Sequence, residues 1–418
     1  MLSKPEREQI IALIKREVVP AIGCTEPIAV ALCVAKAREI LGTEPEKVSA
    51  RLSANILKNA MGVGIPGTGM IGLPIAIALG ALVGRSEYQL EVLKDSDAKA
   101  VERGKRFIEQ GRIDISLKEG ITEKLYIEIE VSGGGHSAVA IIAGGHTNFV
   151  FISRDGETLQ ESRRTSGSEQ EAQGVELNLR KVFDFAMTTP LDEIRFILEA
   201  KRLNKAAAED SFKNNYGHCV GNTLRHAPEL RIIGDCALSC DARMAGAMVP
   251  VMSNSGSGNQ GIATTLPVVV YAEEIKADEE HLVRALVLSH LTAIYIKQSL
   301  GRLSALCGCV VAATGSSCGI TYLMGGGYEA VSFAVKNMIA NLTGMMCDGA
   351  KPSCSLKLMT GVSTAVLSAM LAMENHSVSS VEGIIDDDVD KSIRNLTLIG
   401  RDGMNETDHL ILKIMTSK

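Results

Sequence analysis

Residues 112–153 read RIDISLKEGITEKLYIEIEVSGGGHSAVAIIAGGHTNFVFIS and determine the fold class. Within them, residues 112–117, 125–131, 138–143 and 147–153 are rich in β-branched and aromatic side chains, which favour strands. The intervening sequences KEGITEK, SGGGHS and GGH are typical of turns. We therefore expect consecutive strands that form a small antiparallel sheet.

The chain before this sheet is predicted to be largely helical. Apolar residues at helical spacing predict helices over residues 6–18, 26–41 and 97–110. The second of these helices is expected to end at Gly42, because glycine is common directly after a helix. Partial alternation of apolar and polar residues predicts one further strand over residues 48–56.

The composition changes after the sheet. The polar sequence ESRRTSGSEQEAQG (residues 161–174) predicts a linker, and from residue 175 helix follows helix with almost no strand signal. We place a domain boundary near residue 178. Residues 1–178 are expected to form a mixed α/β domain with the small sheet, and residues 179–418 an all-helical catalytic domain. The predicted fold class is α+β.

Charge and composition argue against a nucleic-acid partner. The 418 residues include 43 Lys plus Arg and 49 Asp plus Glu, which gives a net charge of −6. Proteins that bind the phosphate backbone usually carry a surplus of basic residues. Trp is absent and aromatic residues make up only 4% of the chain, so there are few side chains on which bases could stack.

The N-terminus and the cysteines predict a cytoplasmic protein with reduced thiols. The first residues, MLSKPEREQIIALIKREVV, resemble a charged amphipathic helix rather than a secretion signal. Ten cysteines in so long a chain do not suggest a small disulfide-bonded scaffold.

Three uncharged stretches, residues 59–84, 244–272 and 303–327, are long enough to cross a bilayer. Glycines, prolines and hydroxyl residues interrupt their apolar runs, as in MGVGIPGTGMIGLP and SNSGSGNQG. We therefore expect buried segments packed around an internal site, and no association with a membrane.

Four cysteines are candidates for chemistry. Cys24 directly precedes the predicted helix start Thr25-Glu26-Pro27, where the positive end of the helix dipole lowers the pKa of a thiol. Cys307 lies in SALCGC, and Cys347 and Cys354 bracket the turn CDGAKPSC. Three cysteines can hold an iron–sulfur cluster with one iron left open as a Lewis acid. Cysteines buried only for packing would produce the same spacing.

A glycine- and serine-rich loop, SNSGSGNQG (residues 253–261), lies between two apolar segments and precedes a predicted helix. Its backbone N–H groups, hydroxyls and amides suit a carboxylate or a phosphate. A second glycine-rich segment, residues 55–74, allows backbone to approach a ligand, and Asn55, Lys58 and Asn59 offer polar groups there. Close helix packing explains this second segment equally well.

Three motifs together resemble those of the L-cysteine desulfidase family, which is related to the α chain of iron–sulfur L-serine dehydratases. They are GCTEP (residues 23–27), SNSGSGNQG and the set Cys307, Cys347 and Cys354, and the similarity extends over nearly the whole chain. The resemblance implies an oxygen-sensitive [4Fe–4S] cluster and an α,β-elimination without pyridoxal phosphate. L-cysteine would give pyruvate, ammonia and sulfide.

The resemblance also implies roles for residues. Cys307, Cys347 and Cys354 would bind the cluster, and Cys24 would be the catalytic base or a displaceable fourth ligand. Residues 253–260 would hold the carboxylate and amino groups of a small amino-acid substrate. The substrate-binding candidates are Ser253, Asn254, Ser255, Gly256, Ser257 and Asn259, with Asn55 added from the second glycine-rich segment. The chain ends in MTSK, whereas related serine dehydratases can use a C-terminal cysteine as the resting fourth ligand.

Three alternatives remain open from the sequence. The first is an L-serine dehydratase that uses the same cluster. The second is a pyridoxal-phosphate lyase, in which SGSGNQG cradles the cofactor phosphate and Lys297 or Lys58 forms the Schiff base. The third is a non-catalytic, thiol-rich protein that binds a metal or sulfide. The sequence does not fix the oligomeric state, and a homo-oligomer is compatible with it.

Overall fold

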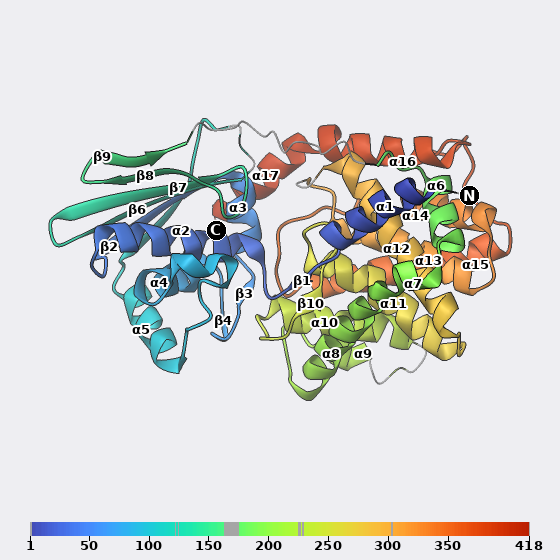
Figure 1. Cartoon of the computed structure of the whole chain (residues 1–418), viewed down its shortest axis with the longest axis horizontal. Helices are drawn as coiled ribbons and strands as arrows, with labels where there is room; N and C mark the ends of the chain where they lie inside the picture. Colours follow the sequence, from blue (N-terminus) through green and yellow to red (C-terminus); the bar gives the residue numbers. More distant parts are fainter. Residues whose placement is uncertain are drawn as a thin grey trace.

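The computed structural model describes residues 2–417 apart from 122, 124, 163–174, 225–226, 228–229 and 302–303. Two parts lie side by side (Figure 1): a β-sheet with helices on one face, and a larger assembly of helices. The predicted α+β fold class, with the sheet in the N-terminal half and helices in the C-terminal half, is confirmed. The predicted linker, residues 161–174, lies outside the described residues from residue 163 onward.

The predicted strands form and are joined by a further strand, β9, in one six-stranded sheet of order β5-β2-β6-β7-β8-β9. Neighbours from β2 to β9 pair antiparallel, but β2 and β5 pair parallel, so the prediction of a purely antiparallel sheet is wrong at this edge. A parallel pair needs a long crossover connection, which the helices between β2 and β5 supply. The strands are β2 (Lys47–Leu52), β5 (Ile113–Leu117), β6 (Tyr126–Gly133), β7 (His136–Ala143), β8 (Phe149–Arg154) and β9 (Glu157–Glu161).

The predicted strand over residues 48–56 is wrong in its second half. Strand β2 ends at Leu52, and helix α3 (Ala54–Ala60) begins after Ser53. Ala, Leu and Lys in this helix favour helical backbone, whereas the alternating pattern belongs only to the strand. The short helix lies at the border with the helical part of the molecule (Figure 1), and Lys58 is one of its buried residues.

Helices cover one face of the sheet. Helix α2 (Thr25–Leu41) packs against β6 and β7, and α4 (Leu73–Leu82) and α5 (Ala98–Glu109) form the layer outside it (Figure 1). Helix α2 is buried along most of its length because it lies between the sheet and α4. It ends at Gly42, as predicted, with a φ of 84° that glycine adopts without strain.

The second part is built around α13 (Gly308–Leu323), which is apolar and contacts four other helices. These are α11 (Gly258–Glu274), α12 (Glu279–Leu300), α14 (Tyr328–Leu342) and α15 (Cys354–Met373). The surrounding helices are α6 (Leu179–Thr188), α7 (Leu191–Ile194), α8 (Leu198–Lys213), α9 (Val220–Leu224), α10 (Arg231–Met244) and α16 (Val389–Leu398).

The two ends of the chain cross between the parts (Figure 1). Helix α1 (Lys4–Glu17) buries Ile10 and Ile14 in the core of the helical part. Helix α17 (Asn405–Thr416) contacts α3 and adds Leu412 to the core beneath the sheet. The boundary near residue 178 stays a prediction; each part contains a helix from the far end of the chain.

Among the described helices, α15 alone is long and apolar enough to span a membrane by length and composition, with a mean hydropathy of 1.5. Core helices of soluble proteins meet the same criterion, so this is weak evidence for a membrane span. The predicted absence of a membrane partner stays a prediction.

Candidate functional site

Two short strands bring the N-terminal motif to the glycine- and serine-rich loop. Strand β1 (Pro20–Ala21) pairs antiparallel with β10 (Val251–Met252). The pairing continues beyond β10, where the N–H of Ser253 donates to the carbonyl oxygen of Val19 at 2.8 Å. Cys24, which precedes α2 as predicted, therefore lies beside the loop of residues 253–261.

Arg243, near the end of α10, links the same two motifs. Its Nη2 donates to the carbonyl oxygen of Gly23 at 3.1 Å and to Sγ of Cys24 at 3.3 Å. Its Nη1 donates to Oδ1 of Asn259 at 3.0 Å. The sequence analysis missed this residue, although a lone cation directly before the uncharged residues 244–272 was a usable signal.

The first half of the loop is anchored inside the protein. Nδ2 of Asn254 donates to the carbonyl oxygen of His290 at 3.2 Å and lies 3.1 Å from its Nδ1. Oδ1 of Asn254 accepts from the Ser255 hydroxyl at 2.8 Å, and the Ser253 hydroxyl donates at 2.6 Å to the segment before β1. Burial lowers the pKa of His290 to about 3, so this imidazole is neutral. The substrate-binding role of these residues stays a prediction.

The second half of the loop starts α11. After Gly256, whose φ is 79°, Oγ of Ser257 caps the helix by accepting from the N–H of Gln260 at 3.4 Å. Oδ1 of Asn259 accepts from the Cys240 thiol at 3.6 Å as well as from Arg243.

Gln260 is distinct within the loop because it is 96% buried while its Oε1 finds no hydrogen-bond partner among the described residues. Its side chain lies against Gly308, where an added Cβ would be 3.0 Å from Cδ. Gly308 directly follows Cys307, so a buried acceptor without a donor lies beside one of the predicted cluster ligands. An unsatisfied buried acceptor is costly and is typical of a place where a ligand binds. Nothing in the sequence distinguishes Gln260 from its neighbours in the loop.

Cys307 and Cys347 meet through a short backbone pairing. Leu306 and Met346 form an isolated antiparallel bridge, and the N–H of Cys347 donates to the carbonyl oxygen of Ala305 at 2.7 Å. The two thiols share a hydrogen bond, which holds the pKa of Cys347 well below its usual value and raises that of Cys307. The structure thus brings together two of the three predicted cluster ligands.

Cys354 stands at the start of α15, and its Sγ lies 3.6 Å from the carbonyl oxygen of Gly349. It interacts electrostatically with Cys347, Cys24 and Cys240. The third predicted ligand and the candidate base therefore belong to the same site. Cys240, whose thiol donates to Asn259, also borders this site.

Lysines surround the sulfur atoms. Lys357 donates to the carbonyl oxygen of Met346 at 2.8 Å, and its charge and that of Lys58 both help to lower the pKa of Cys347. Burial opposes ionisation of Asp348, but hydrogen bonds from Lys351 and Lys357 hold its pKa at about 2. A positive environment of this kind stabilises thiolates and any anionic group that they bind.

Helix α3 closes the site from the sheet side. The carbonyl oxygen of Lys58 lies against Gly349, where an added Cβ would be 2.1 Å from it. The Lys58 ammonium is buried and forms an ion pair with Asp408 of α17. Asn55, a predicted substrate-binding residue, is half-buried on the same helix, and its role stays a prediction.

The predicted depression of the Cys24 pKa is wrong for the ligand-free chain. Cys24 is only 4% exposed, and burial raises its pKa to about 11 although Arg243 acts in the opposite direction. Desolvation of the thiolate therefore outweighs the favourable position before α2.

The thiols of this site match an iron–sulfur cluster better than a single metal ion. Across the described residues, no three His, Cys, Asp or Glu side chains are arranged to hold a metal ion. A cubane cluster presents a different iron to each cysteine, so its ligands stand further apart than those of one ion. Three free thiols in one lysine-rich region fit an anionic cluster in their chemistry. All ten cysteines are free, in agreement with the predicted reduced thiols.

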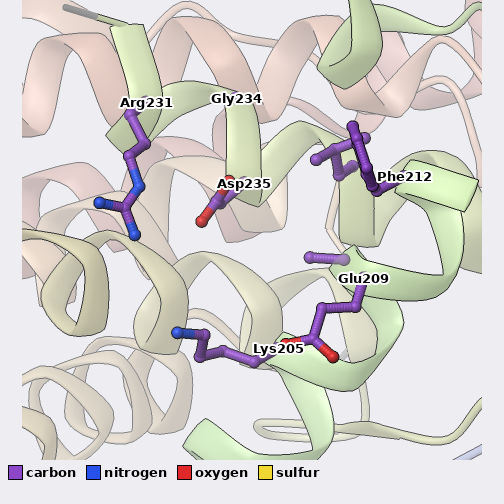
Figure 2. A pocket seen from close by; sticks show the side chains of 8 residues that line it. Lys205, Glu209, Phe212, Arg231, Gly234 and Asp235 are labelled. Carbon is purple, nitrogen blue, oxygen red and sulfur yellow. The ribbon is translucent and has the colours of Figure 1, made fainter. Parts of the chain in front are cut away.

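A pocket of about 490 Å³ lies elsewhere, between α8 and α10 (Figure 2). Lys205 and Arg231 line it together with Glu209 and Asp235, and both cations also pair with Glu273, so its lining carries no surplus of positive charge. None of the predicted site residues lines this pocket. It shares only helix α10 with the site at Cys24.

Comparison with known proteins shows the family to which the chain belongs. Residues 87–413, well over half of the chain, match the family described as serine dehydratase alpha chain, and the chain belongs to this family. The match includes Arg243, the loop of residues 253–261 and the three cysteines, whereas Cys24 and Asn55 precede it. Serine dehydratases are lyases that act on amino acids, and their α chains are typically subunits of iron–sulfur enzymes.

The full-length relatives are known as UPF0597 proteins. One from Bacteroides fragilis (strain ATCC 25285) is 70% identical over 426 residues, which cover 100% of both chains. Another, from Phocaeicola vulgatus, is 71% identical and covers 100% of this chain and 99% of its own. A third, from Aeromonas hydrophila, is 43% identical, and the match covers 99% of this chain and 97% of the relative.

Proposed function

We propose that the protein catalyses an iron–sulfur-dependent α,β-elimination on a small L-amino acid, with L-cysteine converted to pyruvate, ammonia and hydrogen sulfide. The observation that carries the proposal is the convergence on one lysine-rich site of two buried cysteines, Cys24 and Cys307, and two half-buried ones, Cys347 and Cys354. Membership of the serine dehydratase α-chain family supports elimination as the type of reaction.

Cys307, Cys347 and Cys354 would hold a [4Fe–4S] cluster. When bound, such a cluster with an open iron supplies a Lewis acid for the carboxylate and the β-substituent of the substrate. Lys58 and Lys357 stabilise the anionic sulfurs that such binding requires. The surrounding protein keeps water away from Cys24, Gln260 and Cys307, which are each at least nine-tenths buried, while Cys347 and Cys354 are half-buried.

The chain's own residues would bind the substrate and move its α-proton. Oε1 of Gln260 offers an acceptor for the substrate's amino group, and the loop around it restricts the orientation of the amino acid. Cys24, as a thiolate, would take the α-proton, while the electron pair of that C–H bond expels the β-thiolate as sulfide. The resulting aminoacrylate hydrolyses to pyruvate and ammonia.

A second candidate is L-serine dehydration at the same site. The family match favours it, since that family is described by its serine dehydratase α chain. Serine would lose hydroxide in place of sulfide and give the same pyruvate and ammonia. The thiolate of cysteine is a softer ligand for iron, which favours L-cysteine as the substrate.

The test is an anaerobic assay of protein reconstituted with iron and sulfide, with L-cysteine and L-serine supplied in parallel. Pyruvate is followed with both substrates and sulfide with L-cysteine. Higher kcat/KM with L-cysteine is the expected result, and higher kcat/KM with L-serine would assign the dehydratase reaction instead. A reconstituted cluster without turnover of either amino acid would favour a non-catalytic metal- or sulfide-binding protein.

A further inference from the structure

Arg243 is a buried cation whose hydrogen-bond partners are all neutral groups. They are the Gly23 carbonyl, the Asn259 amide and the Cys24 thiol, with the Met244 sulfur at 4.0 Å. Over the residues that the structure describes, no carboxylate lies within ion-pair distance of its guanidinium. Burying a charge without a counter-charge is costly, and such charges are commonly retained where an anion forms or binds.

The loop of residues 253–261 leaves space for the Arg243 guanidinium at Gly258. A Cβ added at Gly258 would lie 2.2 Å from Nε of Arg243 and 2.8 Å from its Cζ. Only a residue without a side chain therefore fits beneath the planar group at this position. Asn259, the next residue, is then in place to accept from Nη1.

We propose that Arg243 is the positioning residue for Cys24. Its guanidinium holds the sulfur atom in a fixed place relative to the loop of residues 253–261, and it provides the positive charge beside the sulfur when Cys24 is anionic. The inference rests on the proposed function, in which Cys24 takes the α-proton of the substrate. Arg243 would act through Cys24 and would not bind the iron–sulfur cluster.

The first test compares Arg243→Gln with Arg243→Lys in the reconstituted full-length protein. Arg243→Gln is expected to lower kcat about 10- to 100-fold, the loss typical of a hydrogen bond to a charged group, with KM and iron content little changed. Arg243→Lys should recover part of this loss, because lysine keeps the positive charge but lacks the planar guanidinium that donates in several fixed directions. Arg231→Gln is the matched control: it lies on the same helix, faces the pocket in Figure 2 and should retain wild-type kcat.

A double-mutant cycle shows whether the effect passes through Cys24. Added to Cys24→Ser, Arg243→Gln should cause no further loss of kcat, since the sulfur that it positions is absent. An equal loss in both backgrounds, or loss of iron from Arg243→Gln, would overturn the positioning role. Normal turnover of Cys24→Ser alone would instead refute the proposed function of Cys24.

Gly258→Ala is a second test, which disturbs the position of the Arg243 guanidinium without replacing the arginine. Its methyl group should displace the guanidinium and lower kcat as Arg243→Gln does, whereas Gly327→Ala, with open space around its Cβ, should not. In metal-free protein, the Tm shifts of Arg243→Gln and Cys24→Ser should be non-additive, a readout that does not depend on activity. Additive shifts together with normal kcat for Gly258→Ala would contradict the inference.

Discussion

Lys58 of α3 forms an ion pair with Asp408 of α17, although 350 residues separate them in the chain. The lysine is buried and contributes to the low pKa of Cys347. The aspartate, near the C-terminal end of the sequence, is partly exposed. The C-terminal helix therefore supplies the counter-charge for a cation inside the candidate site.

Asp408→Asn should destabilise the protein, because it leaves the buried Lys58 ammonium without its carboxylate. Breaking a buried ion pair by removing one partner costs roughly 3–5 kcal/mol, and the partial exposure of Asp408 places the expected loss near the lower value. Urea unfolding of the metal-free protein measures it. Glu8→Gln, which removes a fully exposed partner of Lys4, should change the free energy of unfolding by less than about 0.5 kcal/mol. Equal effects of the two substitutions would show that Lys58 does not depend on this pair.

Cys347→Ser should lose the cluster and the activity together. Anaerobic wild-type protein is expected to contain about four iron and four sulfide per chain, measured by iron and acid-labile sulfide assays. Cys318→Ser is the control, because Cys318 is buried in α13 and its Sγ contacts the carbonyl oxygen of Thr314 at 3.3 Å, which a serine hydroxyl can also do. Full iron content in Cys347→Ser, or loss of iron only in Cys318→Ser, would show that the ligand set is wrong.

Cys24→Ser should retain iron, but its turnover rate should be about 10²- to 10⁴-fold lower than that of the wild type, as expected when a general base is removed. The pH dependence provides a further check. Because burial raises the pKa of Cys24 to about 11 in the free protein, the fraction of thiolate increases with pH, and kcat/KM should rise through the alkaline range. The rise should be absent from the residual activity of Cys24→Ser. A faster-decaying cluster with near-normal turnover would mark Cys24 as a resting fourth ligand instead.

Gln260→Met and Asn254→Ala should separate substrate binding from loop structure. Gln260→Met keeps the shape of the side chain but removes the unpaired Oε1, so KM should rise about 10- to 100-fold without loss of iron. Asn254→Ala removes the amide that contacts Nδ1 and the carbonyl oxygen of buried His290 and should lower stability by roughly 1–3 kcal/mol. Kinetic assays and urea unfolding of both variants measure the two effects. An unchanged KM for Gln260→Met would remove Gln260 from the substrate site.

The local chemistry of the sequence predicted much of the fold. The β-branched segments within residues 112–153 form strands, and Gly42 ends α2, because these preferences depend on neighbouring residues. The helix over residues 54–60 was missed because a short alternating pattern does not show where a strand stops. The parallel pairing of β5 with β2 depends on the intervening helices, which no local pattern encodes.

The candidate site was predictable where residue type alone was informative. Cysteines are rare enough that Cys307, Cys347 and Cys354 attract attention, and the structure places them in one region. Arg243 and Gln260 have common side chains. The sequence hints at Arg243 only through its place before the uncharged residues 244–272, and the importance of Gln260 follows from burial and a missing partner, which only the folded chain shows. The direction of the Cys24 pKa shift was mispredicted for the same reason, since desolvation depends on what covers the sulfur.

Helix α1 packs in the helical part and helix α17 completes the core beneath the sheet. The order of synthesis therefore decides when each part can finish folding. Synthesis proceeds from the N-terminus, so Lys58 leaves the ribosome long before Asp408 exists, and Cys24 long before Cys354. The first half of the chain cannot complete its core, because Leu412 arrives with the last helix. Such distant contacts slow folding and leave apolar surface exposed for longer. The cysteine site can therefore assemble only once Cys354, deep in the second half of the chain, has been synthesised, and any iron cofactor would have to be inserted after that point.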